Sequence, residues 1–306
     1  MVGYSLSYIF EDNSIKYTEH EYSFFLNLPQ YYKRRICSCA GRYPKELTDM
    51  RKKFTLNTVS LGSEPESPKI SSLTDLVSKY KGIEADLLTF QLLLSYSSQK
   101  MANIDEIGTG GKYYRPRLDE ALKWDEELGP SIQPEKMVND YSLITKHDRT
   151  IRSVHESPSL ISSSPSPEDE DGFAEMCHGF SLLMRTLRDA RIYGHIIHMK
   201  NPVSLELELL STPKNLLLLH EPDPDSIEEL LENTQNLVLS AEKVSLLEDL
   251  VDRYQVRNLY LYGASAQDID FASQYMDPDH MKIAGYCLKN EEEFWKKLTV
   301  SAIISV

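Results

Sequence analysis

Short apolar runs of strand length recur along the second half of the chain. From residue 215 onward they are separated by amphipathic stretches with helical spacing of apolar residues, such as DPDSIEELLENT and EKVSLLEDLVDRY. Continuous apolar strands that alternate with helices are typical of a buried parallel sheet, because helices cover both of its faces. The runs are YGHIIHMK (193–200), NLLLLH (215–220), NLVLS (236–240), NLYLYG (258–263), MKIAGYCL (281–288) and VSAIISV (300–306).

The spacing of these runs indicates short βα units. Runs begin at residues 215, 236, 258, 281 and 300, so the intervals are 21, 22, 23 and 19 residues. A flavodoxin-like or Rossmann-like sheet, or part of a barrel, gives such intervals, and so does a leucine-rich solenoid. The solenoid signature is missing and the helices are full length, so we favour an α/β fold with a mostly parallel C-terminal sheet. The segment PVSLELELLS (202–211) interrupts the series, and its Leu/Glu alternation predicts a half-exposed edge or antiparallel strand.

The first half has a different pattern. Two aromatic runs flank the turn-forming EDNS at residues 11–14, which predicts a β-hairpin. Residues 70–145 have mostly helical periodicity, and GIEADLLTFQLLLSYSSQKMANI (82–104) is the longest helical candidate. We therefore expect a helical or α+β region before the parallel sheet.

Between these halves the hydrophobicity falls sharply. Residues 152–172 contain seven serines, three prolines and the acidic run 168–171. Such a composition buries too little apolar surface to offset the entropy of ordering, which predicts a flexible spacer. We expect an N-terminal domain over 1–150, a linker over 151–172 and a C-terminal α/β domain over 173–306. The alternative is one sheet that both halves share, with 152–172 as an excursion from it.

Composition narrows the class of protein. The net charge of −14 and the pI near 5.1 oppose non-specific binding of nucleic acid over the whole surface. No apolar run approaches the roughly 18 residues of a membrane span, and the first residues lack the pattern of a secretory signal. We expect a cytoplasmic protein, or a nuclear one in a eukaryote, without membrane association. The four cysteines are too scattered for a disulfide framework or a zinc knuckle.

One basic segment stands out against the acidic total. Residues 31–53 carry eight lysines and arginines against two acidic residues, a local charge of 8 − 2 = +6. Cations neutralise phosphates and tyrosines stack on unpaired bases, so nucleic acid is a possible partner here. A solvated helix face that pairs with acidic surface elsewhere explains the same residues. The binding candidates are Tyr31, Tyr32, Lys33, Arg34, Arg35 and Arg42.

The second candidate site is the carboxyl edge of the predicted sheet, where ligands bind in open parallel sheets. His198 lies near the end of one apolar run, His220 ends the next, and Glu221 and Asp223 follow it. Imidazoles and carboxylates suit a divalent cation that activates water. Asp223 is equally explained as the cap of the following helix. His195 and His198 lie three apart, so on a strand they point to opposite faces.

No complete catalytic signature is present. The cluster GTGGKYY (108–114) lacks the first glycine and the Ser or Thr of a phosphate-binding loop, and no nucleophile elbow occurs. The sequence therefore predicts no cofactor and leaves open whether the chain is an enzyme. We expect a non-catalytic regulatory or adaptor protein that binds a protein partner. The alternative is a metal-assisted hydrolase that uses His198, His220, Glu221 and Asp223.

Overall fold

A computed structural model describes residues 10–11, 14–15, 53–64 and 86–305. The chain divides into two compact units, Met1–Lys52 and Lys53–Val306. In the first unit, β1 (Phe10–Glu11) pairs antiparallel with β2 (Ser14–Ile15), on either side of the predicted EDNS turn. The basic candidates Tyr31, Tyr32, Lys33, Arg34, Arg35 and Arg42 lie outside the described residues.

The second unit is built from two four-stranded parallel sheets, in the orders β10-β9-β8-β5 and β11-β12-β13-β4. Their strands are β4 (Asn57–Ser63), β5 (Gly108–Gly110), β8 (Arg152–Glu156), β9 (Gly194–Met199), β10 (Asn215–Leu219), β11 (Asn236–Ser240), β12 (Asn258–Tyr262) and β13 (Met281–Cys287). The predicted α/β class, with parallel strands in short βα units, is confirmed.

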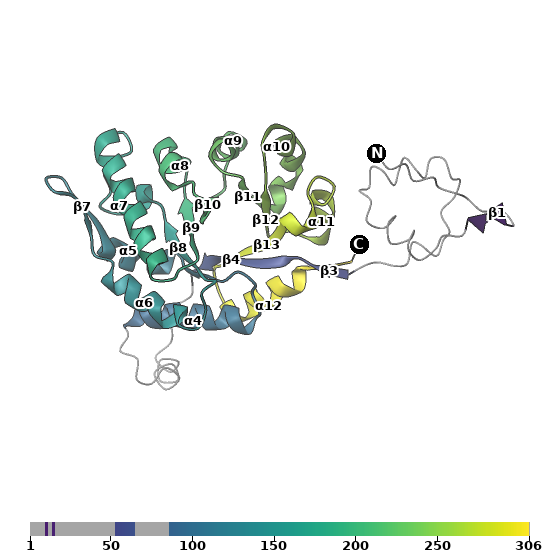
Figure 1. The fold of residues 1–306 in the computed structure, drawn as a ribbon, viewed down its shortest axis with the longest axis horizontal. Coiled ribbons are helices and arrows are strands. Elements are labelled where there is room, and N and C mark those ends of the chain that lie inside the picture. Colours follow the sequence, from purple (N-terminus) through teal and green to yellow (C-terminus); the bar gives the residue numbers. More distant parts are fainter. Residues whose placement is uncertain (1–9, 12–13, 16–52, 65–85, 306) are drawn as a thin grey trace, which may run out of the picture. The chain divides into compact units, whose positions relative to one another are not determined.

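The two sheets join into a barrel (Figure 1). The amide of Ser60 in β4 donates to the carbonyl of Glu106, just before β5, and the amide of Glu106 donates to Thr58, each over 2.9 Å. At the other junction β10 lies against β11. The strands therefore follow one another around the ring in chain order, as they do in a βα barrel. Of the arrangements compatible with the regular spacing, the barrel is the one observed.

Helices surround this ring. They are α4 (Leu87–Met101), α5 (Arg115–Ala121), α6 (Glu135–Thr145), α7 (Glu170–Asp189), α8 (Ser204–Leu210), α9 (Pro224–Asn233), α10 (Leu247–Arg253), α11 (Ala266–Ala272) and α12 (Glu291–Ser301). Side-chain caps fix several starts: Asp86 accepts from the amide of Thr89 at α4, and Ser265 and Asp268 form a capping box at α11. Two antiparallel pairs lie outside the barrel, β6 (Leu122–Asp125) with β7 (Gly129–Ile132), and β3 (Lys53–Thr55) with β14 (Ile303–Ser305). Within the described ranges every helix is too short or too polar to traverse a lipid bilayer.

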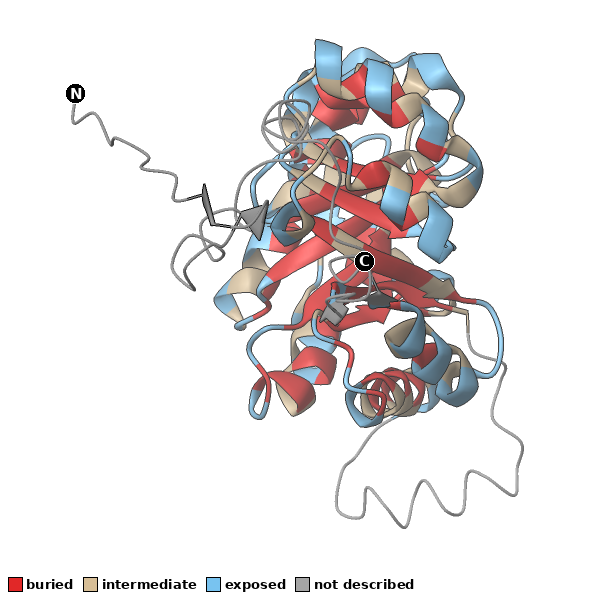
Figure 2. Ribbon diagram, turned by 90° about the vertical axis from the view of Figure 1, so that its right-hand side faces the viewer, coloured by how far each residue is buried: buried red, intermediate tan, exposed pale blue. Residues whose placement is uncertain are grey.

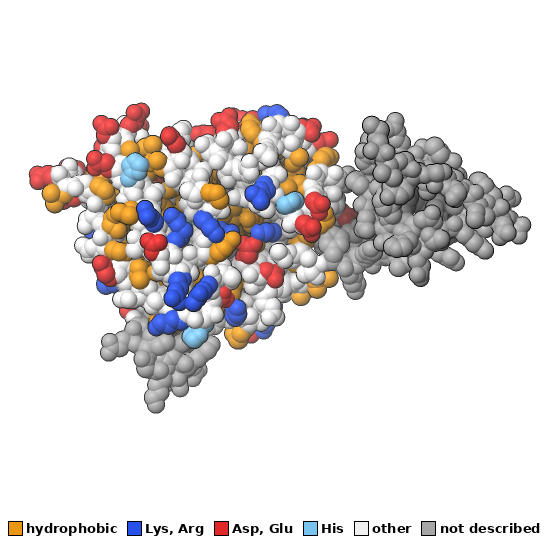
Figure 3. All heavy atoms as spheres, viewed as in Figure 1, with side chains coloured by type: hydrophobic (Ala, Val, Ile, Leu, Met, Phe, Trp, Pro, Cys, Tyr) orange, Lys and Arg blue, Asp and Glu red, His pale blue; other side chains and the backbone are white. Residues whose placement is uncertain are grey.

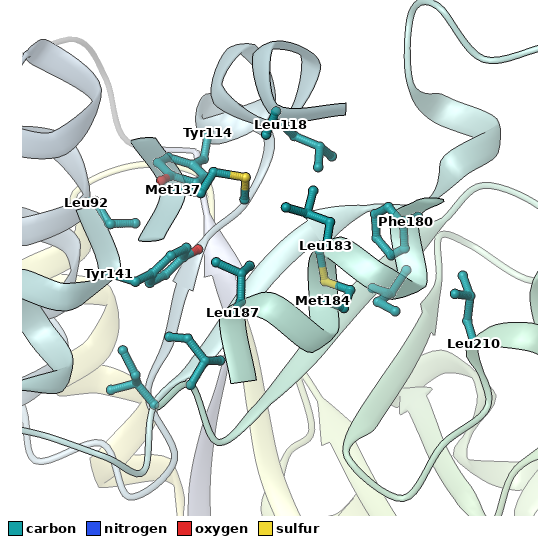
Figure 4. Packing of buried hydrophobic residues seen from close by; sticks show 14 of the residues in the cluster. Leu92, Tyr114, Leu118, Met137, Tyr141, Phe180, Leu183, Met184, Leu187 and Leu210 are labelled. Atoms are coloured by element: carbon teal, nitrogen blue, oxygen red, sulfur yellow. The ribbon is translucent and has the colours of Figure 1, made fainter. Parts of the chain in front are cut away.

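The core has an inner and an outer part. Buried residues of β4, β8, β9, β10, β12 and β13 form one cluster inside the ring, among them Val59, Val154 and Ile196. Two clusters lie between the strands and the helices. In the larger one, Phe180 of α7 lies beside Leu183 and Met184, and Leu187 lies on the side of Tyr141 (Figure 4). In Figure 2 the strands and inward helix faces are buried, whereas the outer helix faces are exposed.

The structure differs from the predicted three-part division. Residues 152–156 of the expected linker form β8, which pairs with β5 on one side and β9 on the other. The following residues include a short 3-10 helix at Pro158–Leu160 and the first turns of α7. The compact-unit boundary falls at 52/53 instead, and strands from the predicted N-terminal domain (1–150) and C-terminal domain (173–306) share one barrel.

Two strand predictions are also corrected. Residues Ser204–Leu210 of PVSLELELLS form helix α8. Glu206 and Leu207 lie four and three residues before Leu210, so a helix buries all three on one face. VSAIISV contributes only the short β14, which pairs antiparallel with β3 and lies outside the parallel ring.

Candidate functional site

A pocket of about 280 Å³ opens at the carboxyl ends of the barrel strands. It receives residues from the ends of β4, β5, β8, β9, β10 and β13: Glu64, Gly111, Lys112, His155, Glu156, Leu160, His198, Lys200, His220 and Tyr286. A second pocket of about 410 Å³ lies where β11 and β12 begin and is lined mainly by neutral amide and hydroxyl side chains. Enzymes with this architecture place their catalytic groups at the carboxyl ends. The pocket at the carboxyl ends, which contains three histidines and two glutamates, is therefore the candidate site.

His198 and His155 are the most buried titratable groups of the pocket. His198 has a second histidine as its neighbour. It lies near the end of β9, with only 3% of its surface exposed. Its Nε2 atom is 2.8 Å from the carbonyl oxygen of Leu61, and its Nδ1 atom is 3.1 Å from Nε2 of His220. Burial, reinforced by the neighbouring His220, lowers the pKa of His198 to about 3. His198 is therefore a neutral imidazole at physiological pH.

His220 lies beside it, one residue beyond β10, and is more exposed. Partial burial lowers the pKa of His220, Lys112 lowers it further, and Glu64 and Glu221 oppose the shift. The Nδ1 atom of His220 has no hydrogen bond to any of the described residues. A neutral imidazole at the rim of a pocket is equipped to accept a proton.

Glu64, Tyr286 and Lys112 form a connected group on the adjacent wall. The hydroxyl of Tyr286 donates to a carboxylate oxygen of Glu64 over 3.1 Å, and the amide of Glu64 donates to the carbonyl of Cys287 over 2.7 Å. The Lys112 ammonium lies 3.9 Å from the other Glu64 oxygen. Burial raises the pKa of Tyr286, so the phenol stays protonated. Glu64 is thus a fixed acceptor beside a mostly exposed cation.

Glu156 ends β8 and is half-buried. Burial raises its pKa, although Arg115 and Lys112 oppose that shift. The Nε atom of Arg115 lies 3.3 Å from a Glu156 oxygen. Arg115 also donates to the carbonyl of Leu160, which lines the pocket. A raised pKa favours the protonated form of the carboxyl group, which is the form that a general acid needs.

The glycine cluster before Lys112 has a structural cause. A β-carbon at Gly108 would lie 2.3 Å from the carbonyl oxygen of Ser60, and one at Gly111 would lie 2.5 Å from that of Ser63. Gly111 also has φ +124°, a conformation that side chains disfavour. These glycines let β5 approach β4 closely and place Lys112 at the pocket.

The predicted edge residues separate into two groups. His198 and His220 meet in the pocket, as the shared strand edge predicts. Asp223 caps α9, since its carboxylate accepts from the amide of Ser226 over 2.7 Å, and Glu221 is exposed with φ +48°. Over 53–64 and 86–305 no group of three or more His, Cys, Asp or Glu residues is arranged to hold a metal ion. His195 bonds Ser153 over 2.7 Å and does not line the pocket.

Sequence interpretation missed six polar residues of the pocket. Each lies near a strand end or just after one, which is the available signal: Glu64, Lys112, His155, Glu156, Lys200 and Tyr286. Glu156 lies in the segment 151–172, which is predicted to be a linker. Lys112 lies in the glycine cluster 108–114, which does not match a phosphate-binding loop. On the face shown in Figure 3, acidic side chains gather along the α7–α10 edge, whereas lysines and arginines gather across the middle.

Comparison of the sequence with protein-family models and with curated proteins finds no match.

Proposed function

We propose that this chain is a hydrolase that cleaves a small anionic ester by proton transfer at the carboxyl mouth of the barrel. The observation that carries the proposal is the contact of His198 with His220, in one pocket with Glu64 and Lys112. Clefts that combine shifted pKa values with charged partners are where catalytic groups are found.

The roles follow from charge and protonation. Lys112 and Lys200 are exposed cations at the pocket and attract the anionic group of a substrate. Neutral His220 removes a proton from water, and Glu156, whose pKa is raised by burial, returns a proton to the leaving oxygen. The volume of about 280 Å³ favours a small metabolite over a polymer.

The proposed site lies at the carboxyl edge predicted from the sequence and includes His198 and His220. It uses them for proton transfer and not as metal ligands. The proposed function differs from the expected adaptor role, for which the basic segment 31–53 was the candidate interface. That role stays a prediction, because residues 31–52, with all six binding candidates, lie outside the described parts of the chain. Fold alone does not decide between the two, since barrels of this kind support many chemistries.

The test uses the full chain in EDTA with 4-nitrophenyl phosphate and bis(4-nitrophenyl) phosphate as probes. We expect turnover, and His220→Asn should lower kcat by about 10²-fold or more. Lys112→Gln should weaken binding of inorganic phosphate, measured by calorimetry. His280→Asn is the matched control, because His280 is exposed and lies just before β13, at the opposite end of the barrel strands.

The proposal fails in either of two cases. One is that the protein neither turns over the probes nor binds phosphate. The other is that His220→Asn and His280→Asn have equal rates, since the imidazole of His220 would then take no part in the reaction.

A further inference from the structure

Three groups form a hydrogen-bonded chain from the barrel wall to the pocket. The carbonyl oxygen of Leu61, on β4, is 2.8 Å from Nε2 of His198, and Nδ1 of His198 is 3.1 Å from Nε2 of His220. A carbonyl oxygen only accepts, so Nε2 of His198 carries a hydrogen. In a neutral imidazole the other nitrogen then accepts, so the hydrogen between the rings belongs to Nε2 of His220.

We infer that His198 is a positioning residue that fixes His220 as the Nε2–H tautomer, leaving Nδ1 as its basic nitrogen. The tautomer rests on the geometry alone, whereas its catalytic meaning rests on the proposed hydrolase function. The Nδ1 atom has no hydrogen bond to a described residue. It is therefore the ring nitrogen of His220 that is available to water or substrate.

A neutral partner has a different effect from the carboxylate that orients histidine in many hydrolases. A carboxylate would raise the pKa of His220, whereas buried His198 carries no charge to do so. The charged groups that act on His220 are Glu64, Lys112 and Glu221, of opposing sign. Tyr286, whose ring lies 5.1 Å from that of His198, stays neutral. His198 thus orients His220 while leaving it unprotonated at physiological pH.

Nitrogen NMR of the full chain with ¹⁵N-labelled histidine tests the tautomer directly. Above the pKa of His220, we expect a protonated-type Nε2 and an unprotonated-type Nδ1 for both His198 and His220. His220→Asn and His198→Asn assign the signals. Averaged nitrogen shifts for His220, or a hydrogen on its Nδ1, would overturn the inference whatever the activity.

Two variants separate positioning from simple packing. Asn and Leu are similar in size, but His198→Asn keeps an acceptor near the Nδ1 position and His198→Leu has none. We expect His198→Asn to keep the tautomer with kcat within about threefold, and His198→Leu to average it and lower kcat roughly tenfold, a fraction of the full acid–base contribution. Equal behaviour of the two variants would contradict the positioning role.

The outcomes also separate this inference from the proposed function. A fixed tautomer without probe turnover refutes the hydrolase and leaves the orientation of His220 by His198 established. Turnover that depends on His220 with a mixed tautomer refutes the positioning role alone.

Discussion

Removal of the carboxylate of Asp140 should destabilise the barrel strongly. Asp140 is 5% exposed on α6 and accepts three hydrogen bonds, from Thr89 over 2.6 Å, Tyr114 over 2.8 Å and Arg117 over 2.9 Å. These bonds tie α6 to α4 and to the short helix Lys112–Tyr114, which begins with a pocket residue. Asp140→Ala would leave the buried Tyr114 hydroxyl and one side of a buried guanidinium without partners, whereas the Thr89 hydroxyl keeps Asp86 at 3.0 Å.

The loss of unfolding free energy depends on the partners that Arg117 keeps in the variant. Breaking a buried ion pair by removing one partner costs about 3–5 kcal/mol. Arg117 is only 3% exposed but keeps Asp86 at 2.5 Å and Glu120 at 3.1 Å, so we expect the lower end, about 3 kcal/mol. At about 2–4 °C per kcal/mol for a unit of this size, Tm should fall by about 6–12 °C.

Thermal and urea unfolding of the full chain measure this loss. Glu292→Gln is the control, because Glu292 pairs with Lys296 on the exposed face of α12 and should leave Tm unchanged. The argument is refuted if Asp140→Ala and Glu292→Gln have the same Tm. Such a result would mean that water satisfies Arg117 and Tyr114 as well as Asp140 does.

Two further variants address the buried Glu206 and the predicted edge residue Asp223. Glu206 is fully buried, and burial raises its pKa above 4.5, so its contribution to stability is fully present below pH 4.5 and falls as the pH rises through the raised pKa. Glu206→Gln should remove that decline, seen by urea unfolding at pH 5 and pH 8, and an unchanged slope would contradict this assignment. Asp223→Ala should lower Tm by a few degrees through loss of the α9 cap without changing probe turnover. A large loss of turnover would instead return Asp223 to the catalytic set.

The regular βα spacing was visible in the sequence because buried parallel strands are apolar along their whole length. β10, β11, β12 and β13 were predicted from this signal and are present. β8 was missed because RSVHE is short and is followed by a run of serines and prolines, so the average composition of 151–172 resembled a spacer.

The order of that serine-rich loop comes from long-range partners. The amide of Ser159 donates to Glu206 over 2.6 Å, and the hydroxyl of Ser163 accepts from the amide of Trp124 over 3.2 Å. Arg115 donates to the hydroxyl of Ser162 over 3.3 Å. These partners lie 39 to 47 residues away, so local composition gives no sign of them.

Only part of the candidate site can be predicted from the sequence, because local composition does not reveal contacts between distant segments. His198 lies near the end of β9 and His220 follows the neighbouring parallel strand β10, so their proximity follows from topology. Glu64 and Tyr286 are 222 residues apart, and they meet only because β4 pairs with β13. No local pattern in the sequence predicts that pairing.

The pairing of β4 with β13 also bears on how the barrel folds. β4 precedes all of the other barrel strands in the chain and β13 follows them, so the ring is complete only after both have been made. Contacts of such long sequence separation form slowly, because a long loop must be closed before any pairing energy is gained. Truncation at residue 172 would leave β8 without β9 and β4 without β13. Fragments divided there should therefore aggregate rather than fold, and the barrel is the smallest part of this chain in which the pocket can be studied.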